Sequence, residues 1–384
     1  MNTLEELLAV DPKAIVSSVN ASTRSLLDAN PGGIVFFGAG PLGKVALKRA
    51  RNAGVVPIAF ADNNPSRWGT ECEGVPIIST QEAASRFGKN CTFVITVYTS
   101  APVWAQLRSL GVEPISLARF GWLYSKEFLP FYGYNLPFKV FDNISAVYEA
   151  GAIWADDESR KEFVEQIRWR TTLSPEVLRS HPPASDTYFA PDLFSFHDHE
   201  VFVDCGAYDG DSIKPFVEQV KGNFERIIGL EPDPLNRDRF EKFRQALPTA
   251  QANRIELLPF ALGDKRERLE FDVTGTVVSV LGSGKNIVDC VPLDEVVTIP
   301  PTYIKMDIEG AEPAALRGAV RLIRDHRPIL SICLYHAIEH IWEIPLWVKR
   351  LVPEYHLFLR RYSDECWEQI LYAIPPERVT KKSS

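Results

Sequence analysis

The chain has 384 residues, of which 45% are hydrophobic and 24% charged, with a formal net charge of −8. This length favours two or three domains, and the composition is ordinary for a globular protein. The negative net charge argues against a nucleic-acid partner, since phosphate binding usually needs a basic face. No apolar run approaches ~18 residues, so we expect neither a transmembrane helix nor a membrane partner.

The compartment is predicted from the N-terminus and the cysteines. The first residues are amphipathic and acidic, which is not typical of a signal peptide. The six cysteines are scattered and contain no CxxC pair, which favours buried free thiols over disulfides. We therefore expect a cytoplasmic protein.

Residues 1–120 predict a small Rossmann-like α/β domain. After one or two short helices, apolar strands are expected over 32–37, 55–62, 74–78 and 91–98. Helices are expected after Gly43 and over 81–88 and 101–111. Strands that alternate with helices predict a parallel sheet covered on both faces.

The first strand of this domain is followed by GAGPLG, a full GxGxxG turn. Its glycines are Gly38, Gly40 and Gly43, and Asp62 ends the next strand. Taken alone, this pattern predicts a second nucleotide site, for NAD(P) or a related ligand. A domain that binds no ligand and serves only for docking remains an equal alternative.

Residues 121–196 predict an aromatic-rich helical connector. Phe and Tyr crowd a stretch that contains Pro and Gly, which indicates packing between domains. Ser159 and Glu162 have the spacing of a capping box, so a helix should begin at Ser159 and end near Trp169 or Thr171.

Residues 197–384 return to alternating strands and helices. We expect strands over 201–205, 226–230, 255–261, 303–307, 328–335, 355–360 and 365–374, and helices over 212–220, 234–246, 311–324 and 342–351. The segment 263–300 has hairpin character, and the last two strands are joined by so short a loop that they should be antiparallel. The polar tail 377–384 should lack regular structure.

The most informative segment is VFVDCGAYDGDS, in which an apolar strand ends at Asp204 and a turn follows with Gly206, Ala207 and Gly210. Asp211 or Ser212 can cap the next helix. Glu231 ends the following strand, at the distance from the glycines where a ribose hydroxyl partner belongs.

The acidic residues of this loop indicate which kind of cofactor it could bind. Asp204, Asp209 and Asp211 are poor neighbours for a pyrophosphate. They suit a cofactor that carries a sulfonium, an ammonium and ribose hydroxyls. A tight strand–helix turn with a capping acid is the structural alternative.

A second acidic segment is IKMDIEGAE, where Asp307 ends a strand at the edge at which open α/β sheets bind ligands. We expect functional roles for Asp307 and Glu309, whereas Glu312 is interpreted as a residue that favours a helix N-terminus. A divalent metal on Asp307 and Glu309 remains open, but the spacing does not require one.

A third segment, SICLYHAIEH, ends a strand at Tyr335 and His336. A neutral histidine there could take a proton from an acceptor hydroxyl. His336, Glu339 and His340 also spell H-x-x-E-H, a zinc pattern that needs both histidines on one helix. Because His336 is expected to end a strand, no metal site is predicted.

Together, VFVDCGAYDGDS, EPDP, ALGD, IKMDIEGAE and ICLYH, followed by W-EIP, resemble the FkbM family of methyltransferases over about residues 185–375. The resemblance implies a class I methyltransferase sheet, mostly parallel with a terminal antiparallel hairpin. It implies S-adenosylmethionine as cofactor and O-methylation of a hydroxyl on a sugar, a glycan or a polyketide-like small molecule.

The resemblance also assigns roles. His336 is the expected base, with Asp307 as orienter or alternative base. The cofactor residues are Asp204, Gly206, Ala207, Gly210, Asp211, Ser212, Glu231, Leu262 and Asp264. The acceptor residues are Glu309, Tyr335 and Trp342.

Two other functions remain open. One is an NAD(P)-dependent oxidoreductase that uses the Gly38 loop, and the other is a non-catalytic nucleotide-sugar-binding protein. A homo-oligomer is also left open.

Overall fold

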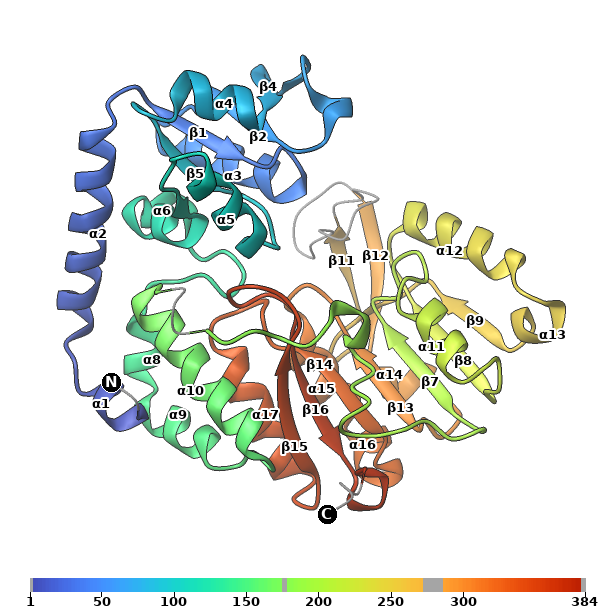
Figure 1. Cartoon of the computed structure of the whole chain (residues 1–384). Helices are drawn as coiled ribbons and strands as arrows, with labels where there is room; N and C mark the ends of the chain where they lie inside the picture. The colour runs from blue at the N-terminus through green and yellow to red at the C-terminus, as the bar shows by residue number, and fades with distance from the viewer. Residues whose placement is uncertain (1–2, 175–177, 272–285, 381–384) are drawn as a thin grey trace.

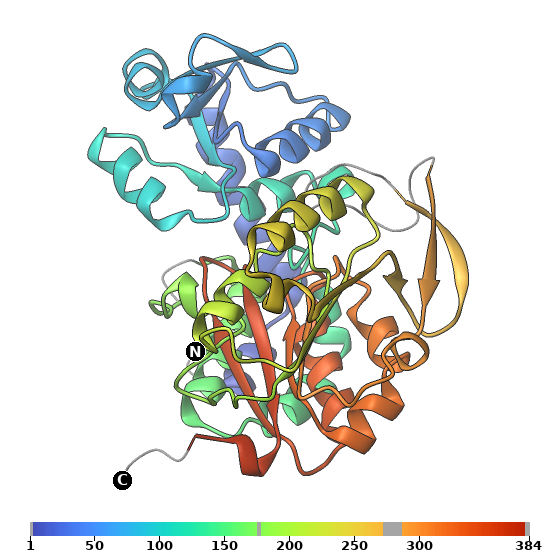
Figure 2. The ribbon, with the colours of Figure 1, turned by 90° about the vertical axis from the view of Figure 1, so that its right-hand side faces the viewer.

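The computed structural model describes residues 3–174, 178–271 and 286–380. Two α/β units, each built around its own sheet, lie one above the other (Figures 1 and 2). Within the described residues, no helix is long and apolar enough to cross a membrane.

The N-terminal unit has a six-stranded sheet in the order β3-β4-β2-β1-β5-β6, parallel except for the short β3. Its central strands are fully buried, which explains their unbroken apolar sequences. The strands are β1 (Ile34–Phe37), β2 (Ala59–Asp62), β3 (Glu71–Cys72), β4 (Val75–Ser79), β5 (Thr92–Ile95) and β6 (Ile115–Ser116). Its covering helices are α3 (Pro41–Asn52), α4 (Thr80–Phe87) and α5 (Ala101–Ser109).

Helices connect the two units. The long α2 (Pro12–Ala29) runs from α1 (Leu4–Leu8) up to the N-terminal sheet (Figure 1). The chain then descends through α6 (Leu117–Leu123), α7 (Ser125–Phe128), α8 (Phe138–Asp142), α9 (Ile144–Gly151) and α10 (Asp157–Thr172). Since α1 and α2 both contact α10, the first thirty residues tie the N-terminal unit to the connector.

The start of α10 corrects one sequence prediction. The N-cap is Asp156, whose carboxylate accepts the Ser159 N–H at 2.9 Å. Ser159 therefore lies in the first turn and is not the cap. Asp156 has the better geometry because its short acidic side chain reaches the N–H three residues on.

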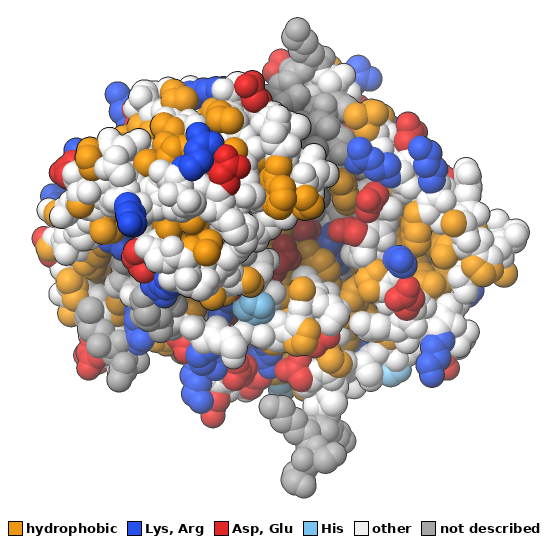
Figure 3. Space-filling view, turned by 45° about the horizontal axis from the view of Figure 1, so that its top comes forward, with side chains coloured by type: hydrophobic (Ala, Val, Ile, Leu, Met, Phe, Trp, Pro, Cys, Tyr) orange, Lys and Arg blue, Asp and Glu red, His pale blue; other side chains and the backbone are white. Residues whose placement is uncertain are grey.

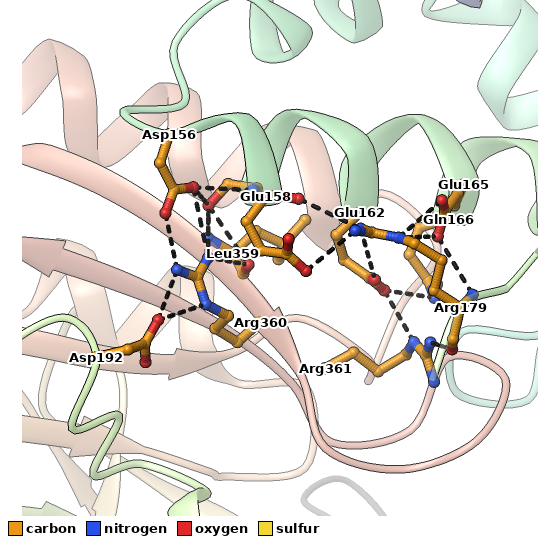
Figure 4. Close-up of polar contacts among 11 residues, drawn as sticks. Asp156, Glu158, Glu162, Glu165, Gln166, Arg179, Asp192, Leu359, Arg360 and Arg361 are labelled. Atoms are coloured by element: carbon orange, nitrogen blue, oxygen red, sulfur yellow. Dashed lines mark hydrogen bonds and ion pairs between the residues drawn. The ribbon is translucent and has the colours of Figure 1, made fainter. Parts of the chain in front are cut away.

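Buried arginines fasten α10 to the C-terminal sheet (Figure 4). Arg360 on β15 (His356–Arg361) pairs with Asp156 at 2.7 Å and with Asp192 at 2.9 Å. Its neighbour Arg361 pairs with Glu162 at 2.8 Å. Removing one partner of a buried pair leaves an uncompensated charge, so this network fixes the connector against the sheet.

The C-terminal unit has a seven-stranded sheet in the order β15-β16-β14-β13-β7-β8-β9. Only β16 runs antiparallel, between β14 and β15. Besides β15, the strands are β7 (Val201–Cys205), β8 (Arg226–Leu230), β9 (Ile255–Leu258), β13 (Tyr303–Met306), β14 (Ile329–Cys333) and β16 (Gln369–Ile374). The helices are α11 (Ile213–Gln219), α12 (Pro234–Ala246), α13 (Thr249–Ala252), α14 (Leu293–Val296), α15 (Glu312–Arg317), α16 (Val320–His326) and α17 (His340–Leu351).

Two predicted elements are split. The helix expected over 311–324 breaks at Gly318, where a Cβ would lie 2.0 Å from the Gly263 carbonyl oxygen. The strand expected over 255–261 ends at Leu258, and β10 (Ala261–Leu262) joins a small sheet with β12 (Asn286–Val291) and β11 (Glu267–Phe271). The β11–β12 pair is the expected antiparallel hairpin, although its turn lies outside the described residues.

This mixed α/β architecture, with a mostly parallel C-terminal sheet and a smaller N-terminal α/β unit, confirms the predicted fold class. All six cysteines are buried and free, as expected. The boundaries at residues 120 and 196 remain predictions. The end of the polar tail, residues 381–384, lies outside the described residues.

Candidate functional site

A cavity opens at the carboxyl ends of β7, β8 and β13, where an open α/β sheet is expected to bind its ligand. About 750 Å³ of space there is not filled by atoms, part of it open to solvent. Six predicted site residues line it: Gly206, Asp211, Glu231, Leu262, Asp307 and Glu309. Figure 3 shows this face of the molecule, with acidic side chains deep in a hollow near its centre.

Two glycines allow the loop after β7 to lie close to its neighbours. Gly206 has φ of 85°, and a Cβ on it would stand 1.9 Å from the Asp307 carbonyl oxygen. Gly210 has φ of 93°, and a Cβ there would stand 2.6 Å from the Phe243 ring. Neither position tolerates a side chain, which explains both glycines.

Glu231 closes this loop from the next strand. One carboxylate oxygen accepts the Tyr208 N–H at 3.0 Å, and the other accepts the Asp233 N–H at 2.8 Å. The Asn236 side-chain amide also donates to this second oxygen at 3.5 Å, so the oxygen that accepts from Tyr208 is the one with a lone pair free for a ligand hydroxyl. Within the described residues, no lysine or arginine pairs with this carboxylate.

Asp204 lies beneath the cavity rather than on its wall. The register of β7 and β13 places it opposite Lys305, and the Lys305 ammonium lies 3.1 Å from its carboxylate. The Ser212 hydroxyl donates to the same carboxylate. The prediction placed Asp204 and Ser212 against the cofactor, but their side chains are bound to each other, and Asp204 also to Lys305, so they position the loop from below.

Three carboxyl groups on the cavity wall carry raised pKa values. Burial raises the pKa of Asp211 to about 6 and the pKa values of Glu231 and Glu309 to about 7. A buried carboxylate is costly without a counter-charge. The cavity is therefore suited to a ligand that brings positive charge.

Asp307 is held by two tyrosines. The Tyr188 hydroxyl donates to one oxygen at 2.7 Å, and the Tyr335 hydroxyl donates to the other at 3.2 Å. Tyr335 is thus a neighbour of Asp307 and not part of the cavity wall. The two bonds fix the carboxylate plane at the point where the cavity meets His336.

His336 lies between three carboxylates. Its Nδ1 is 2.8 Å from Glu312, and its Nε2 is 3.3 Å from Asp307 and 3.8 Å from Glu309. Burial lowers the pKa of the ring, but Glu312, followed by Asp307 and Glu309, outweighs burial and raises this pKa to about 10. The expected neutral base is therefore an imidazolium at neutral pH in this arrangement.

Several residues of the cavity wall and of the Asp307–His336 cluster and its surroundings have a strained backbone. Tyr132, Tyr188, Tyr208, Glu309 and Glu368 have φ between 44° and 69°, in the left-handed region that non-glycine residues rarely adopt. Tyr132 packs against His336 with ring centroids 5.9 Å apart, and Tyr208 lines the cavity. Such strain is typical of functional sites.

Known proteins resolve which kind of site this is. A family model described as the methyltransferase FkbM domain matches residues 204–367, which include the loop after β7, Asp307 and His336. Residues 204–367 form an FkbM methyltransferase domain. This family implies S-adenosylmethionine-dependent methyl transfer, and the match confirms the resemblance drawn from the motifs.

One solved structure agrees with this assignment over nearly the whole chain. The crystal structure of methyltransferase FkbM from Methylobacillus flagellatus KT is similar over 94% of this chain and 100% of its own, with a TM-score of 0.71 and 26% identity. A putative rRNA methylase from Clostridium thermocellum and an rRNA methylase from Streptococcus thermophilus each align with 51% of this chain. They align over 98% and 97% of their own lengths, with TM-scores of 0.33 and 0.31 and identities of 14% and 12%. No curated protein matches this chain.

Three further predicted residues of the FkbM domain do not line its cavity. Trp342 is fully buried in the core on α17, so it does not form an acceptor surface. Asp264 is half-exposed and pairs with Arg317 at 3.1 Å. Ala207 is buried in the core, with its Cβ close to Gly229, so only its backbone belongs to the loop.

The H-x-x-E-H pattern does not form a zinc site within the FkbM domain. β14 ends at Cys333, so His336 lies in the loop before α17, whereas His340 begins that helix. Glu339, the middle acid of the pattern, forms an ion pair with Lys139 instead. The rejected pattern nevertheless contains a residue of the actual cluster, His336.

The glycine loop of the N-terminal unit has the predicted geometry, but the acid that follows it is paired with an arginine. A Cβ on Gly43 would stand 1.9 Å from the Gly38 carbonyl oxygen, and Gly40 caps α3. Asp62 accepts the Ala39 N–H at 2.9 Å and pairs with Arg67 at 3.0 Å. The proposed ribose partner is thus already neutralised by a residue of its own unit.

Three residues that belong to the site were missed from sequence. Lys305 and Glu312 come from the motif around Asp307, and Tyr188 comes from the connector. The lysine inside an otherwise apolar strand was an available signal, because a buried lysine requires a charged partner. Nothing local pointed to Tyr188.

Proposed function

We propose that this protein is an S-adenosylmethionine-dependent O-methyltransferase. The observation that carries the proposal is the cavity of the FkbM domain, whose wall carries Asp211, Glu231 and Glu309 with raised pKa values. S-adenosylmethionine brings a sulfonium and an ammonium, which would compensate these carboxylates.

The wall residues divide among the parts of the cofactor. Glu231 would accept a ribose hydroxyl, because its oxygen that accepts from the Tyr208 N–H has a second lone pair available. Asp211 would face the ammonium, and Phe260 and Leu262 would enclose the adenine. The methyl group would then lie toward Asp307.

Methyl transfer depends mainly on how the two reactants are positioned. The sulfonium methyl is already electrophilic, so holding an acceptor oxygen in line with the carbon–sulfur bond supplies much of the rate. An alcohol also loses its proton during attack. Asp307, fixed by two tyrosines and exposed to the cavity, would orient the hydroxyl and accept that proton, and the His336 ring lies 3.3 Å from its carboxylate.

The class of acceptor is inferred from the charge of the cavity. An acidic hollow repels polyphosphates, so we infer a small molecule or a glycan with free hydroxyls and no nucleic acid. The buried free cysteines agree with a reducing, cytoplasmic location.

The test uses S-adenosylmethionine with a labelled methyl group and a panel of sugars, glycans and polyketide alcohols. We expect label in at least one hydroxyl acceptor, with an O-methyl signal in the NMR spectrum of the product. Asp307→Asn should lower the rate at least tenfold, whereas Asp264→Asn should not. Transfer to nitrogen or carbon, or an unchanged rate in Asp307→Asn, would contradict the proposal.

A further inference from the structure

His336 is oriented as metal-ligating histidines are. In such sites one ring nitrogen faces the ion and the other donates its N–H to a carboxylate. Here Nδ1 lies 2.8 Å from a Glu312 oxygen. That oxygen also accepts the Ile308 N–H at 2.9 Å, so Glu312 is itself anchored. Nε2 therefore points away from Glu312, toward the cavity side of the cluster.

Nε2 and the neighbouring Glu309 oxygen are buried and lack hydrogen bonds among the described residues. The His336 side chain is 1% exposed, and its Nε2 has no hydrogen-bond partner of acceptable geometry among the described residues. The same holds for one oxygen of Glu309 and one of Glu312. Buried polar atoms normally have partners, and orphaned ones call for a ligand that would satisfy them.

The spacing around Nε2 fits a single ion. Nε2 lies 3.3 Å from an Asp307 oxygen and 3.8 Å from the orphaned Glu309 oxygen. Ligands that share one ion at bond lengths of about 2.0–2.2 Å lie about 3–4.4 Å apart, depending on the angle between them.

We propose that Asp307, Glu309 and His336 bind one divalent cation, with Glu312 holding the His336 ring from behind. Two carboxylates and one imidazole favour an ion of the Mn²⁺ or Zn²⁺ class over Ca²⁺, which takes oxygen ligands. Tyr188 and Tyr335 would act in the same way as Glu312, because hydrogen bonds to a ligating carboxylate fix its orientation.

The role of this ion rests on the proposed function. A carboxylate alone is a weak base for an alcohol, because the pKa of an alcohol lies far above that of a carboxylic acid. A divalent cation that binds the acceptor oxygen lowers its pKa and holds it in place. The ion lies beside Glu309, on the wall shared with the cofactor cavity. It would therefore select acceptors that offer a hydroxyl able to ligate a metal.

The experiment measures binding of Mn²⁺ to the full chain by the loss of the free-ion signal in electron paramagnetic resonance. It needs neither cofactor nor acceptor, so its outcome is separate from that of the methyl-transfer test. We expect one ion per chain, with affinity lowered at least tenfold in His336→Asn and in Glu309→Gln. Glu339→Gln is the matched control, since Glu339 belongs to the same sequence pattern but pairs with Lys139.

Folding is checked for each variant by circular dichroism, and Glu309→Gln covers the case in which His336→Asn does not fold. Loss of binding in the two cluster variants with normal binding in Glu339→Gln supports the site. The absence of binding at millimolar Mn²⁺, or equal binding in wild type and Glu309→Gln, overturns it. His336 would then be the resident cation of the cluster.

Discussion

The chain contains two loops built on the same plan. In each, a buried strand ends in a glycine turn, a helix follows, and an acid at the end of the next strand accepts a backbone N–H from the turn. Asp62 accepts from Ala39 at 2.9 Å, and Glu231 accepts from Tyr208 at 3.0 Å. Each acid also accepts, at 2.8 Å, the backbone N–H of the residue two positions after it, which is Asn64 for Asp62 and Asp233 for Glu231.

The loops differ in what neutralises the acid. Arg67 lies 3.0 Å from Asp62. Burial raises the pKa of Asp62, but backbone N–H groups and Arg67 outweigh burial and leave that pKa below its ordinary value. The pKa of Glu231 is raised to about 7 by burial, and its hydrogen bonds do not compensate.

The two loops show that a glycine motif predicts the conformation of the loop but not the ligand that it binds. The better match to GxGxxG lies in the N-terminal unit, where the acid is already compensated. The poorer match lies in the FkbM domain, where the acid lines a cavity and, among the described residues, no lysine or arginine pairs with it. Charge balance, rather than glycine spacing, separates the two.

The largest expected effect concerns the buried Lys305–Asp204 ion pair beneath the Glu231 loop. Lys305 and Asp204 are 3% and 0% exposed, so Lys305→Met should strand a buried carboxylate and lower the free energy of unfolding by about 3–5 kcal/mol. Arg67→Met, at an arginine side chain that is 41% exposed, should cost less than about 1 kcal/mol. Urea denaturation of both variants makes the comparison. Equal losses would contradict the distinction between a buried and a solvated loop.

A smaller effect is expected from pH. Asp211 and Glu231, with pKa values raised to about 6 and about 7, must ionise to attract a cationic cofactor. Affinity for S-adenosylmethionine should therefore rise several-fold between pH 5.5 and 7.5, and Glu231→Gln should flatten the dependence. Calorimetric titrations at three pH values measure this.

The same groups predict the stability of the unliganded protein. A folded-state pKa raised above the unfolded value means that the folded chain holds protons which the unfolded chain has lost. Their contribution to stability is therefore full below the unfolded pKa and falls as the pH rises toward 7. A thermal midpoint whose pH dependence is the same in wild type and Glu231→Gln would contradict this assignment.

The smallest effect tests a corrected residue. Asp264 and Arg317 form a solvated pair outside the cavity, with side chains 40% and 50% exposed. Asp264→Asn should change cofactor affinity by less than about 0.5 kcal/mol. A tenfold loss would return Asp264 to the binding site that the resemblance implied.

Local sequence patterns predict the fold and about half of the site residues. Apolar runs ending in an acid located β7, β8 and β13, because such strands are buried on both faces and their carboxyl ends meet at one edge. Gly206 and Glu231 were predictable for the same reason, since their roles depend only on a strand, a turn and the next strand.

Contacts across the sheet were not predictable. Lys305 meets Asp204 only through the register of β13 against β7, and Glu312 meets His336 only because β14 lies beside β13. Glu312 was interpreted as a helix N-terminus residue, and by position it is one, at the first residue of α15. Its contact with His336, which raises that ring's pKa, is a tertiary property that its own sequence neighbourhood does not encode.

The central claim is that the cofactor binds at the Glu231 loop and not at the Asp62 loop. Isothermal titration of S-adenosylmethionine into wild type, Glu231→Gln and Asp62→Asn tests it directly. The loss of a charged hydrogen-bond acceptor should cost about 1.5–3 kcal/mol, or roughly 10- to 100-fold in affinity, in Glu231→Gln alone. Weakened binding in Asp62→Asn with unchanged binding in Glu231→Gln would contradict the account.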